Sequence, residues 1–311
     1  MTDRERHLKQ LELARHLLGD LAGEDIDAID IKSVGVSEAP FLAKIVSKLS
    51  PMVGNLMEQR IVHFLDAHAN TGFSWMRQDP GFPDALLLDD GRVTGTGIEI
   101  KAWYVLSTEI TGRFKESQNL LAGKNIDVVI VAWCMSHMIF GKPKILGVLG
   151  VPGADIAASR DFHYHNPPEY LIIEPQDTSR RSNNLQQSNV NGYRLQDSDC
   201  DVRELRAIQE HYRLHPFTGS PPSREAQEEA AQLKNKLIYR MDTNFAKIDR
   251  IDNPHIEEFK SAMLTEEYLG LTISQWKSIF RDLNGTAVGP RTRAERVIRD
   301  LYDGMLSRGL E

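Results

Sequence analysis

The feature of this sequence that most constrains its fold is the run DVVIVAW at residues 127–133, which is almost entirely apolar. A strand of this composition is typical of the interior of a sheet, where both faces are covered. Other extended runs surround it, at 73–77, 85–88, 98–105, 144–149 and 170–174. The middle of the chain therefore predicts a mixed α/β structure built on a central sheet.

Apolar residues recur at helical spacing on both sides of this sheet region. The first part of the chain has three such segments, at 2–21, 52–69 and 108–122. The last part has four, at 223–240, 254–264, 273–283 and 291–306. Thr272, followed three residues later by Gln275, predicts a capping box at the start of one of them.

A change of composition at residues 217–222, FTGSPP, marks the best candidate linker in the chain. We therefore predict a domain over residues 1–216, which holds the sheet and the N-terminal helices. A mainly helical C-terminal subdomain is predicted over residues 223–311.

The 311 residues are 41% apolar and 26% charged, which is ordinary for a globular protein. No apolar run of about 18 residues and no leader pattern is visible, so we expect a cytoplasmic protein without a membrane partner. The net charge of −7 argues against a uniformly basic surface but leaves room for local positive charge in a DNA-binding cleft. Phosphate-loop, dinucleotide, esterase and zinc-protease motifs are absent, which argues against those enzyme classes.

Two short strands and the hairpin between them carry the candidate chemistry. Asp84 stands at the entrance of the first strand, and Glu99 and Lys101 lie within the second. Because strand side chains alternate, Glu99 and Lys101 point to one face, and the hairpin lets Asp84 reach the same place. Converging carboxylates are the hard oxygen ligands that Mg²⁺ prefers, and a divalent metal activates water for phosphodiester hydrolysis.

These residues resemble the motif of the PD-(D/E)xK nuclease superfamily, in which Pro-Asp is followed by an acidic residue, any residue and lysine. The matching residues are Pro83, Asp84, Glu99, Ile100 and Lys101. The resemblance implies a restriction-endonuclease-like fold, with a central mixed sheet flanked by helices. It also implies that Asp84 and Glu99 bind the metal and that Lys101 orients or activates the attacking water.

Two further metal ligands follow from the same resemblance. The carbonyl of Ile100 could be one of them. Members of the superfamily often carry an additional acidic residue on the helix before the sheet, and Glu58 occupies that place. For Glu58, a solvated helix residue is an equally good interpretation.

The bland alternative is a solvated strand face on which Glu99 and Lys101 merely form an ion pair, which is common in sheets. Two other acidic-x-Lys triplets, at 30–32 and 258–260, show how easily the letters arise. The first has no Pro-Asp before it, and the second falls in a helical pattern. Only the triplet at 99–101 stands in the strand, hairpin and strand context that the chemistry needs.

Residues 178–196 form a candidate DNA-reading loop that contains no acidic residue. Arginine can pair bidentately with guanine, and asparagine or glutamine with adenine. The alternative is a merely solvated loop, since the same residue types are common there. The candidate DNA-contacting residues are Arg180, Arg181, Asn183, Asn184, Gln186, Gln187, Asn189, Asn191 and Arg194.

A weaker basic cluster lies on the last predicted helix, at Arg291, Arg293, Arg296 and Arg299. A helix-turn-helix contact with DNA is one interpretation. A charged helix face packed on the domain or lining a dimer is favoured, because Glu295, Asp300 and Asp303 dilute the charge.

The resemblance implies a type II restriction endonuclease, a Mg²⁺-dependent hydrolase that cuts double-stranded DNA at a short palindromic sequence and leaves 5′-phosphate ends. A homodimer would match the symmetry of such a site. A restriction–modification role would also imply a partner DNA methyltransferase. The alternatives are a structure-specific or repair nuclease and a non-catalytic DNA-binding protein.

Overall fold

The structure is a computed structural model that describes residues 1–32, 35–107, 121–165, 171–174, 193–196 and 253–306, with 203, 210 and 225 as single positions. The chain divides into two compact units. The first comprises Met1–Ile110, Asn125–Val151 and His255–Glu311, and the second comprises Thr111–Lys124 and Pro152–Pro254. The first unit holds both the main sheet and the C-terminal helices.

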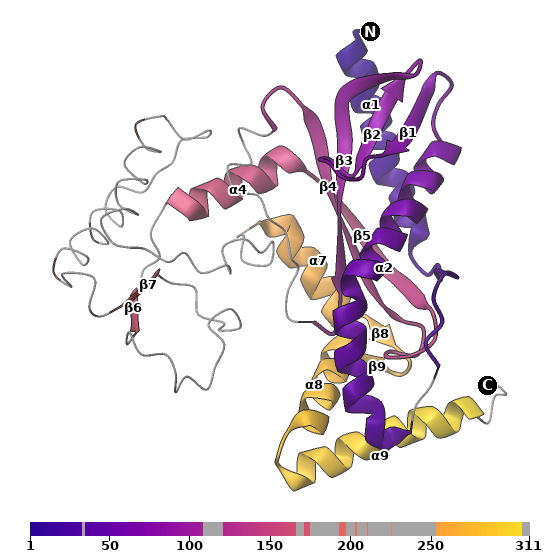
Figure 1. Ribbon diagram of the computed structural model, residues 1–311, viewed down its shortest axis with the longest axis vertical. Helices are drawn as coiled ribbons and strands as arrows, with labels where there is room; N and C mark the ends of the chain where they lie inside the picture. Colours follow the sequence, from indigo (N-terminus) through magenta and orange to yellow (C-terminus); the bar gives the residue numbers. More distant parts are fainter. Residues whose placement is uncertain are drawn as a thin grey trace. The chain divides into compact units, whose positions relative to one another are not determined.

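A five-stranded mixed sheet forms the centre of the first unit (Figure 1). Its strands lie in the order β1-β2-β3-β4-β5, with β1–β2 and β2–β3 antiparallel and β3–β4 parallel. Their bounds are β1 (Phe73–Arg77), β2 (Ala85–Asp89), β3 (Arg92–Tyr104), β4 (Asn125–Met135) and β5 (Pro143–Pro152). The predicted mixed α/β class is confirmed at this level.

Strand β4 lies between β3 and β5, and every residue after Asn125 in it is buried. Its apolar sequence therefore reflects burial on both faces, as predicted. Parallel pairing of β3 with β4 requires a crossover connection between them. The helix predicted at 108–122 falls in this connection, and residues 108–120 lie outside the described part of the chain.

The β2–β3 connection is a tight turn at Asp90 and Gly91, whose φ angles are 48° and 76°. Two successive positive φ angles are the geometry of a type I′ hairpin turn, for which an Asp-Gly pair is well suited. The predicted hairpin between these two strands is thus confirmed. In the ladder that follows, Ala85 lies opposite Ile98.

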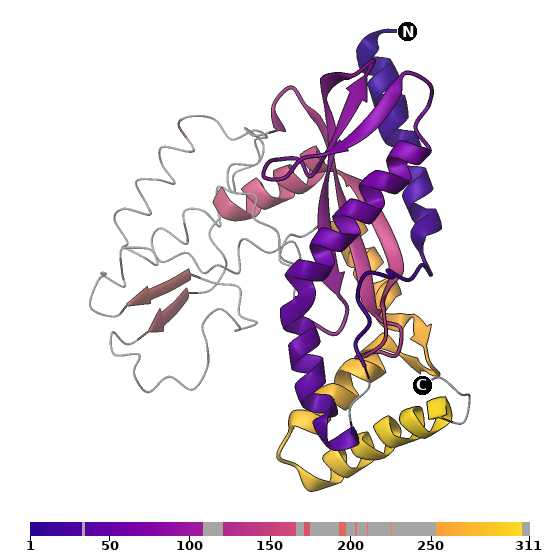
Figure 2. The same ribbon diagram turned by 45° about the vertical axis from the view of Figure 1, so that its right-hand side comes forward.

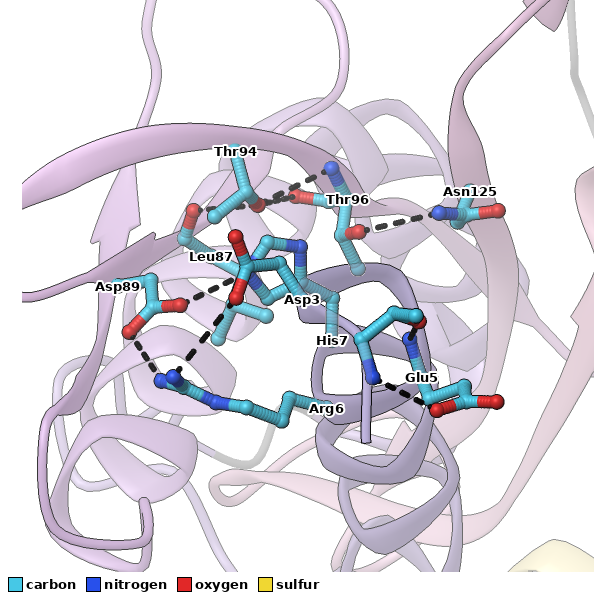
Figure 3. A network of polar contacts seen from close by, with 10 residues as sticks. Asp3, Glu5, Arg6, His7, Leu87, Asp89, Thr94, Thr96 and Asn125 are labelled. Carbon is cyan, nitrogen blue, oxygen red and sulfur yellow. Dashed lines mark hydrogen bonds and ion pairs between the residues drawn. The ribbon is translucent and has the colours of Figure 1, made fainter.

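Helix α1 (Asp3–Leu17) continues into a 3-10 turn, η1 (Leu18–Leu21). Arg6 and His7 attach it to the β2–β3 hairpin, through contacts of 2.6 Å and 2.9 Å with the two carboxylate oxygens of Asp89 (Figure 3). Near its other end, Arg15 donates two hydrogen bonds to Asp127 on β4, at 2.8 Å and 3.1 Å. Polar contacts therefore hold both ends of α1 on the sheet.

Helix α2 (Ala39–Ala67) follows η2 (Val36–Glu38) and begins thirteen residues before the predicted start at 52. The expected boundary was wrong because Pro51 lies inside the helix and does not open it. Leu42, Val46 and Val53 are buried on one side of this helix, so packing continues through the proline. Contacts with β1, β3, α8 and η2 compensate for the hydrogen bond that proline cannot donate.

Helices cover both faces of the sheet. A Cβ added at Gly54 of α2 would lie 3.6 Å from the side chain of Ala102. The ring of the next residue, Trp103, meets Phe259 of helix α7 (Pro254–Thr265) with 6.3 Å between centroids. Because consecutive strand residues point to opposite faces, α2 and α7 lie on opposite sides of β3.

The C-terminal part of the first unit is helical apart from a short hairpin of β8 (Glu267–Tyr268) and β9 (Leu271–Thr272). Helix α8 (Ile273–Asn284) begins with the predicted capping box, in which Thr272 and Gln275 exchange hydrogen bonds of 2.8 Å and 3.2 Å. Helix α9 (Val288–Leu306) begins three residues before its predicted start and packs on α8 (Figure 2).

In the second unit the structure describes helix α4 (Gly153–His165) and a parallel pair of strands, β6 (Leu171–Glu174) and β7 (Tyr193–Gln196). The predicted strand at 170–174 is confirmed. Strand β7 takes up the last four residues of the segment expected to be a DNA-reading loop, so that end is not a loop. The predicted linker at 217–222 and most of the helix at 223–240 lie outside the described residues.

Among the helices that the structure describes, none has the length and apolar character needed to cross a membrane.

Candidate active site

The ladder between β2 and β3 places Asp84 beside Ile100. Ala85 is the first residue of β2, so β2 offers no backbone partner to the Ile100 amide. The Asp84 carboxylate takes that role, since Ile100 N–H donates to its Oδ2 at 2.6 Å. The N–H and C=O of one strand residue point to the same side, so the Ile100 carbonyl also faces the side of Asp84.

Glu99 and Lys101 meet on one face of β3, as their spacing predicted. The ammonium of Lys101 donates a short hydrogen bond to Glu99 Oε1 and lies 4.0 Å from Asp84 Oδ2. The side chains of Asp84, Glu99 and Lys101 are only 17%, 11% and 20% exposed. Two carboxylates and one ammonium are thus gathered in a largely desolvated place.

The electrostatics of this cluster are unbalanced toward negative charge. The pKa of Asp84 is raised from 3.8 to about 6, mainly by burial and next by the neighbouring carboxylate of Glu99. Lys101 and the Ile100 amide act in the opposite direction. A side-chain hydrogen bond between Asp84 and Glu99, which needs a proton on one of them, also favours the protonated form.

One oxygen of this cluster has no hydrogen-bond partner. Glu99 Oε2 is buried, and no group in the described part of the chain donates to it. A buried carboxylate oxygen without a donor is costly, unless a cation or a water satisfies it. The oxygens of Asp84, Glu99 and the Ile100 carbonyl are all hard ligands, so this donor set fits a divalent cation such as Mg²⁺.

Glu58 lies on α2 and contacts Arg77 of β1, with 3.0 Å between Glu58 Oε2 and the guanidinium. Burial raises the pKa of Glu58, the Arg77 hydrogen bond opposes that shift, and the charge of Asp84 adds to it. Glu58 is therefore close enough to act on Asp84, but its carboxylate faces Arg77. The described residues contain no group of three or more His, Cys, Asp or Glu that could hold a metal ion, so the metal role of Glu58 stays a prediction.

Two residues of this region escaped the sequence analysis. Arg77 holds Glu58 and also contacts Asp79 at 3.1 Å. In the sequence, Arg77 stands at the end of a predicted strand, across the loop from Asp84. That position could have indicated that Arg77 lies near the candidate site. Gly97 is required for close packing, because an added Cβ would lie 2.5 Å from both the Ala85 carbonyl oxygen and Pro83 Cγ.

The two other acidic-x-Lys triplets do not form a comparable cluster. Lys32 contacts Asp30 at 3.3 Å, and these side chains are 81% and 44% exposed. Lys260 contacts Glu257 on the same helix rather than Glu258. The triplet at 99–101 is thus the one whose acidic residue is buried.

The structure describes one of the nine predicted DNA-contacting residues, Arg194. Arg180, Arg181, Asn183, Asn184, Gln186, Gln187, Asn189 and Asn191 lie outside the described residues. Arg194 lies in β7, opposite Ile172 of β6. Their roles stay predictions.

In comparisons with known proteins, no family model, no curated protein and no solved structure matches the chain.

Proposed function

We propose that this chain is a Mg²⁺-dependent DNA endonuclease of the type II restriction class, with Asp84, Glu99 and Lys101 at its active site. The observation that carries the proposal is the convergence of two buried carboxylates, one with an unsatisfied oxygen, beside a lysine and a strand carbonyl. An ion pair between Glu99 and Lys101 alone would not require a second carboxylate, Asp84, to be buried beside Glu99.

Asp84, Glu99 and the Ile100 carbonyl would hold the cation. When bound, Mg²⁺ supplies Lewis-acid activation of water and neutralises the charge that grows on phosphorus. The chain itself contributes preorganisation, because the Ile100 amide fixes the Asp84 carboxylate at 2.6 Å before any ligand arrives.

Lys101 would hold the attacking water through its ammonium hydrogens. Its ammonium already donates to Glu99 and lies 4.0 Å from Asp84, so a water that accepts from it is kept beside both carboxylates. Arg77 would keep Glu58 in place beside this group.

The wider proposal follows from the same resemblance. The enzyme would act as a homodimer on a short palindromic sequence in double-stranded DNA and leave 5′-phosphate ends. Residues 180–194 would read the bases, and a DNA methyltransferase would protect the host in the same cytoplasm.

The test is cleavage of one sequenced plasmid in the presence of Mg²⁺ by the wild-type chain and its Asp84→Ala and Lys101→Ala variants. We expect each variant to lose at least about 10²-fold in rate, because each removes a group of the reacting centre. Asp30→Ala and Lys32→Ala are matched controls, since they remove the same residue types from an exposed triplet, and should cut normally. Full activity in Asp84→Ala or Lys101→Ala would refute the assignment.

The same digest separates the alternatives. Discrete fragments with defined ends support a restriction enzyme, whereas nicking only at branched substrates supports a repair nuclease. The ion pair between Glu99 and Lys101 is also what a non-catalytic DNA-binding protein would show. Binding without any cleavage in Mg²⁺ would favour that second candidate.

A further inference from the structure

Helix α9 presents a row of arginines to solvent. Ala294 and Ile298 are 3% and 0% exposed, whereas Arg293, Arg296 and Arg299 are exposed. At about 100° per residue, the three arginines lie centred on the side opposite to Ala294 and Ile298. We call Arg293, Arg296 and Arg299 the arginine ridge.

The guanidinium groups of the arginine ridge are not committed to polar contacts within the described part of the chain. Within the described ranges, none of its three guanidinium groups makes an ion pair or hydrogen bond, although Glu295 and Asp300 lie close in sequence. Glu295 instead pairs with Arg291, at 3.0 Å. Arg293 and Arg296 lie in the N-terminal half of α9, where positive charge gains nothing from the helix dipole.

The ridge is carried by a packed pair of helices, α8 and α9. Helix α8 buries Trp276 and Phe280 and is fixed at its start by the capping box. Residues 285–287 join it to α9, and the two helices pack on each other (Figure 1, Figure 2). Two packed helices joined by a short turn form a helix-turn-helix unit, whose second helix can enter a groove of DNA.

We infer that the arginine ridge of α9 binds the phosphate backbone of duplex DNA. This inference rests on the proposed function, because it gives the proposed nuclease a second contact with its substrate, outside the active site and outside residues 180–194. Exposure of the three arginines does not support the half of the favoured interpretation in which this face packs on the domain. The other half, a contact in a dimer, is an outcome of the test below.

The spacing of the ridge suits a polyanion. Residues three apart on a helix advance about 4.5 Å along its axis, so each arginine can meet a different phosphate. A strand of duplex DNA carries one phosphate per about 3.4 Å of axis, and the planar guanidinium can bind phosphate oxygens bidentately. A membrane surface fits less well, because the apolar side of α9 already faces the protein.

The test measures binding of a labelled DNA duplex by the full chain without Mg²⁺, over a range of salt concentrations. For Arg293→Ala/Arg296→Ala/Arg299→Ala, we expect weaker binding and a log K against log salt slope that is smaller by about 3, one for each lost phosphate contact. The corresponding triple Lys variant should keep most of the slope. The matched control Arg4→Ala/Lys9→Ala/Arg92→Ala removes the same charge from other exposed positions and should leave the slope unchanged.

Three results would overturn the inference. One is an unchanged slope in the triple Ala variant. Another is a change from dimer to monomer with an unchanged slope, which would make the ridge a contact between copies. The third is stronger retention on anionic phosphatidylserine vesicles than on DNA. A wild-type chain that binds DNA with the expected slope but never cuts it in Mg²⁺ would refute the proposed nuclease function. The same result would support DNA binding by the arginine ridge.

Discussion

The carboxylate of Asp84 replaces a missing backbone acceptor. It accepts the Ile100 amide at the point where β2 has not yet begun, and it does so beside a second carboxylate, Glu99. Hydrogen bonding fixes its position, while burial and Glu99 oppose its negative charge. A carboxylate that is fixed by a hydrogen bond while its pKa is strongly raised is typical of sites that bind a ligand.

The raised pKa of Asp84 predicts a pH-dependent stability. Its folded-state pKa of about 6 exceeds the ordinary 3.8, so the stabilising contribution is fully present below pH 3.8 and is lost as the pH rises through 6. Asp84→Asn keeps an acceptor for Ile100 without the charge. In EDTA, we expect the wild type to lose about 1 to 2 kcal/mol relative to this variant between pH 4 and pH 7, after a discount for partial exposure.

Urea unfolding followed by tryptophan fluorescence at several pH values measures this difference. The same comparison for Asp30→Asn, at an exposed carboxylate, is the control. A constant difference between Asp84→Asn and the wild type from pH 4 to pH 7 would contradict the electrostatic account.

At the scale of elements, the β2–β3 hairpin is what unites the candidate residues. The type I′ turn pairs Asp89 with Arg92 and Leu88 with Val93. An irregularity between Leu86 and Leu88 then shifts the register, so that Ala85 lies opposite Ile98. Gly97 lets the two strands and Pro83 approach closely at that point. The position of Asp84 therefore depends on Gly97, a residue without a functional side chain.

Gly97→Ala should separate the strands beside Asp84. Its Cβ would meet the Ala85 carbonyl oxygen and Pro83 Cγ at 2.5 Å, so the backbone beside Asp84 must shift. We expect a loss of about 1 to 3 kcal/mol in unfolding free energy, typical of overpacking, together with reduced cleavage. Thermal denaturation and the plasmid assay measure the two effects.

Gly19→Ala is the matched control, because a Cβ there meets nothing within 4 Å. It should change the unfolding free energy by no more than about 1 kcal/mol and leave cleavage intact. Equal behaviour of the two alanine variants would show that the close contact at Gly97 does not position Asp84.

At the scale of the whole molecule, ionic contacts join segments that are far apart in sequence. Arg15 of α1 and Asp127 of β4 are 112 positions apart. The Arg15 side chain is 37% exposed, whereas that of Asp127 is 3% exposed. The two partners therefore differ in what each would lose if the other were removed.

Arg15→Ala should destabilise the protein more than Asp127→Asn. The first leaves a buried carboxylate without its guanidinium, which we expect to cost about 2 to 4 kcal/mol. The second leaves an arginine that can turn to solvent, with an expected cost of about 1 kcal/mol. Chemical unfolding of both variants and of the double variant measures the asymmetry, and a larger effect of Asp127→Asn would contradict it.

The sequence by itself determined the features that depend on neighbouring residues. Alternation placed Glu99 and Lys101 on one face, Asp90-Gly91 specified the hairpin, and Thr272 with Gln275 specified the start of α8. The apolar run at 127–133 specified a fully buried strand. Each of these patterns is complete within a few residues of the chain.

Only the tertiary structure decided the features that join distant segments. Helix α2 continues through Pro51 because buried residues on either side pack on other elements. Glu58 faces Arg77, and the arginine ridge points to solvent, because of what packs around α2 and α9. Long-range packing can override the local propensity of a segment, and it selects one of several possible partners for a side chain. These outcomes therefore cannot be predicted from residues that are neighbours in sequence.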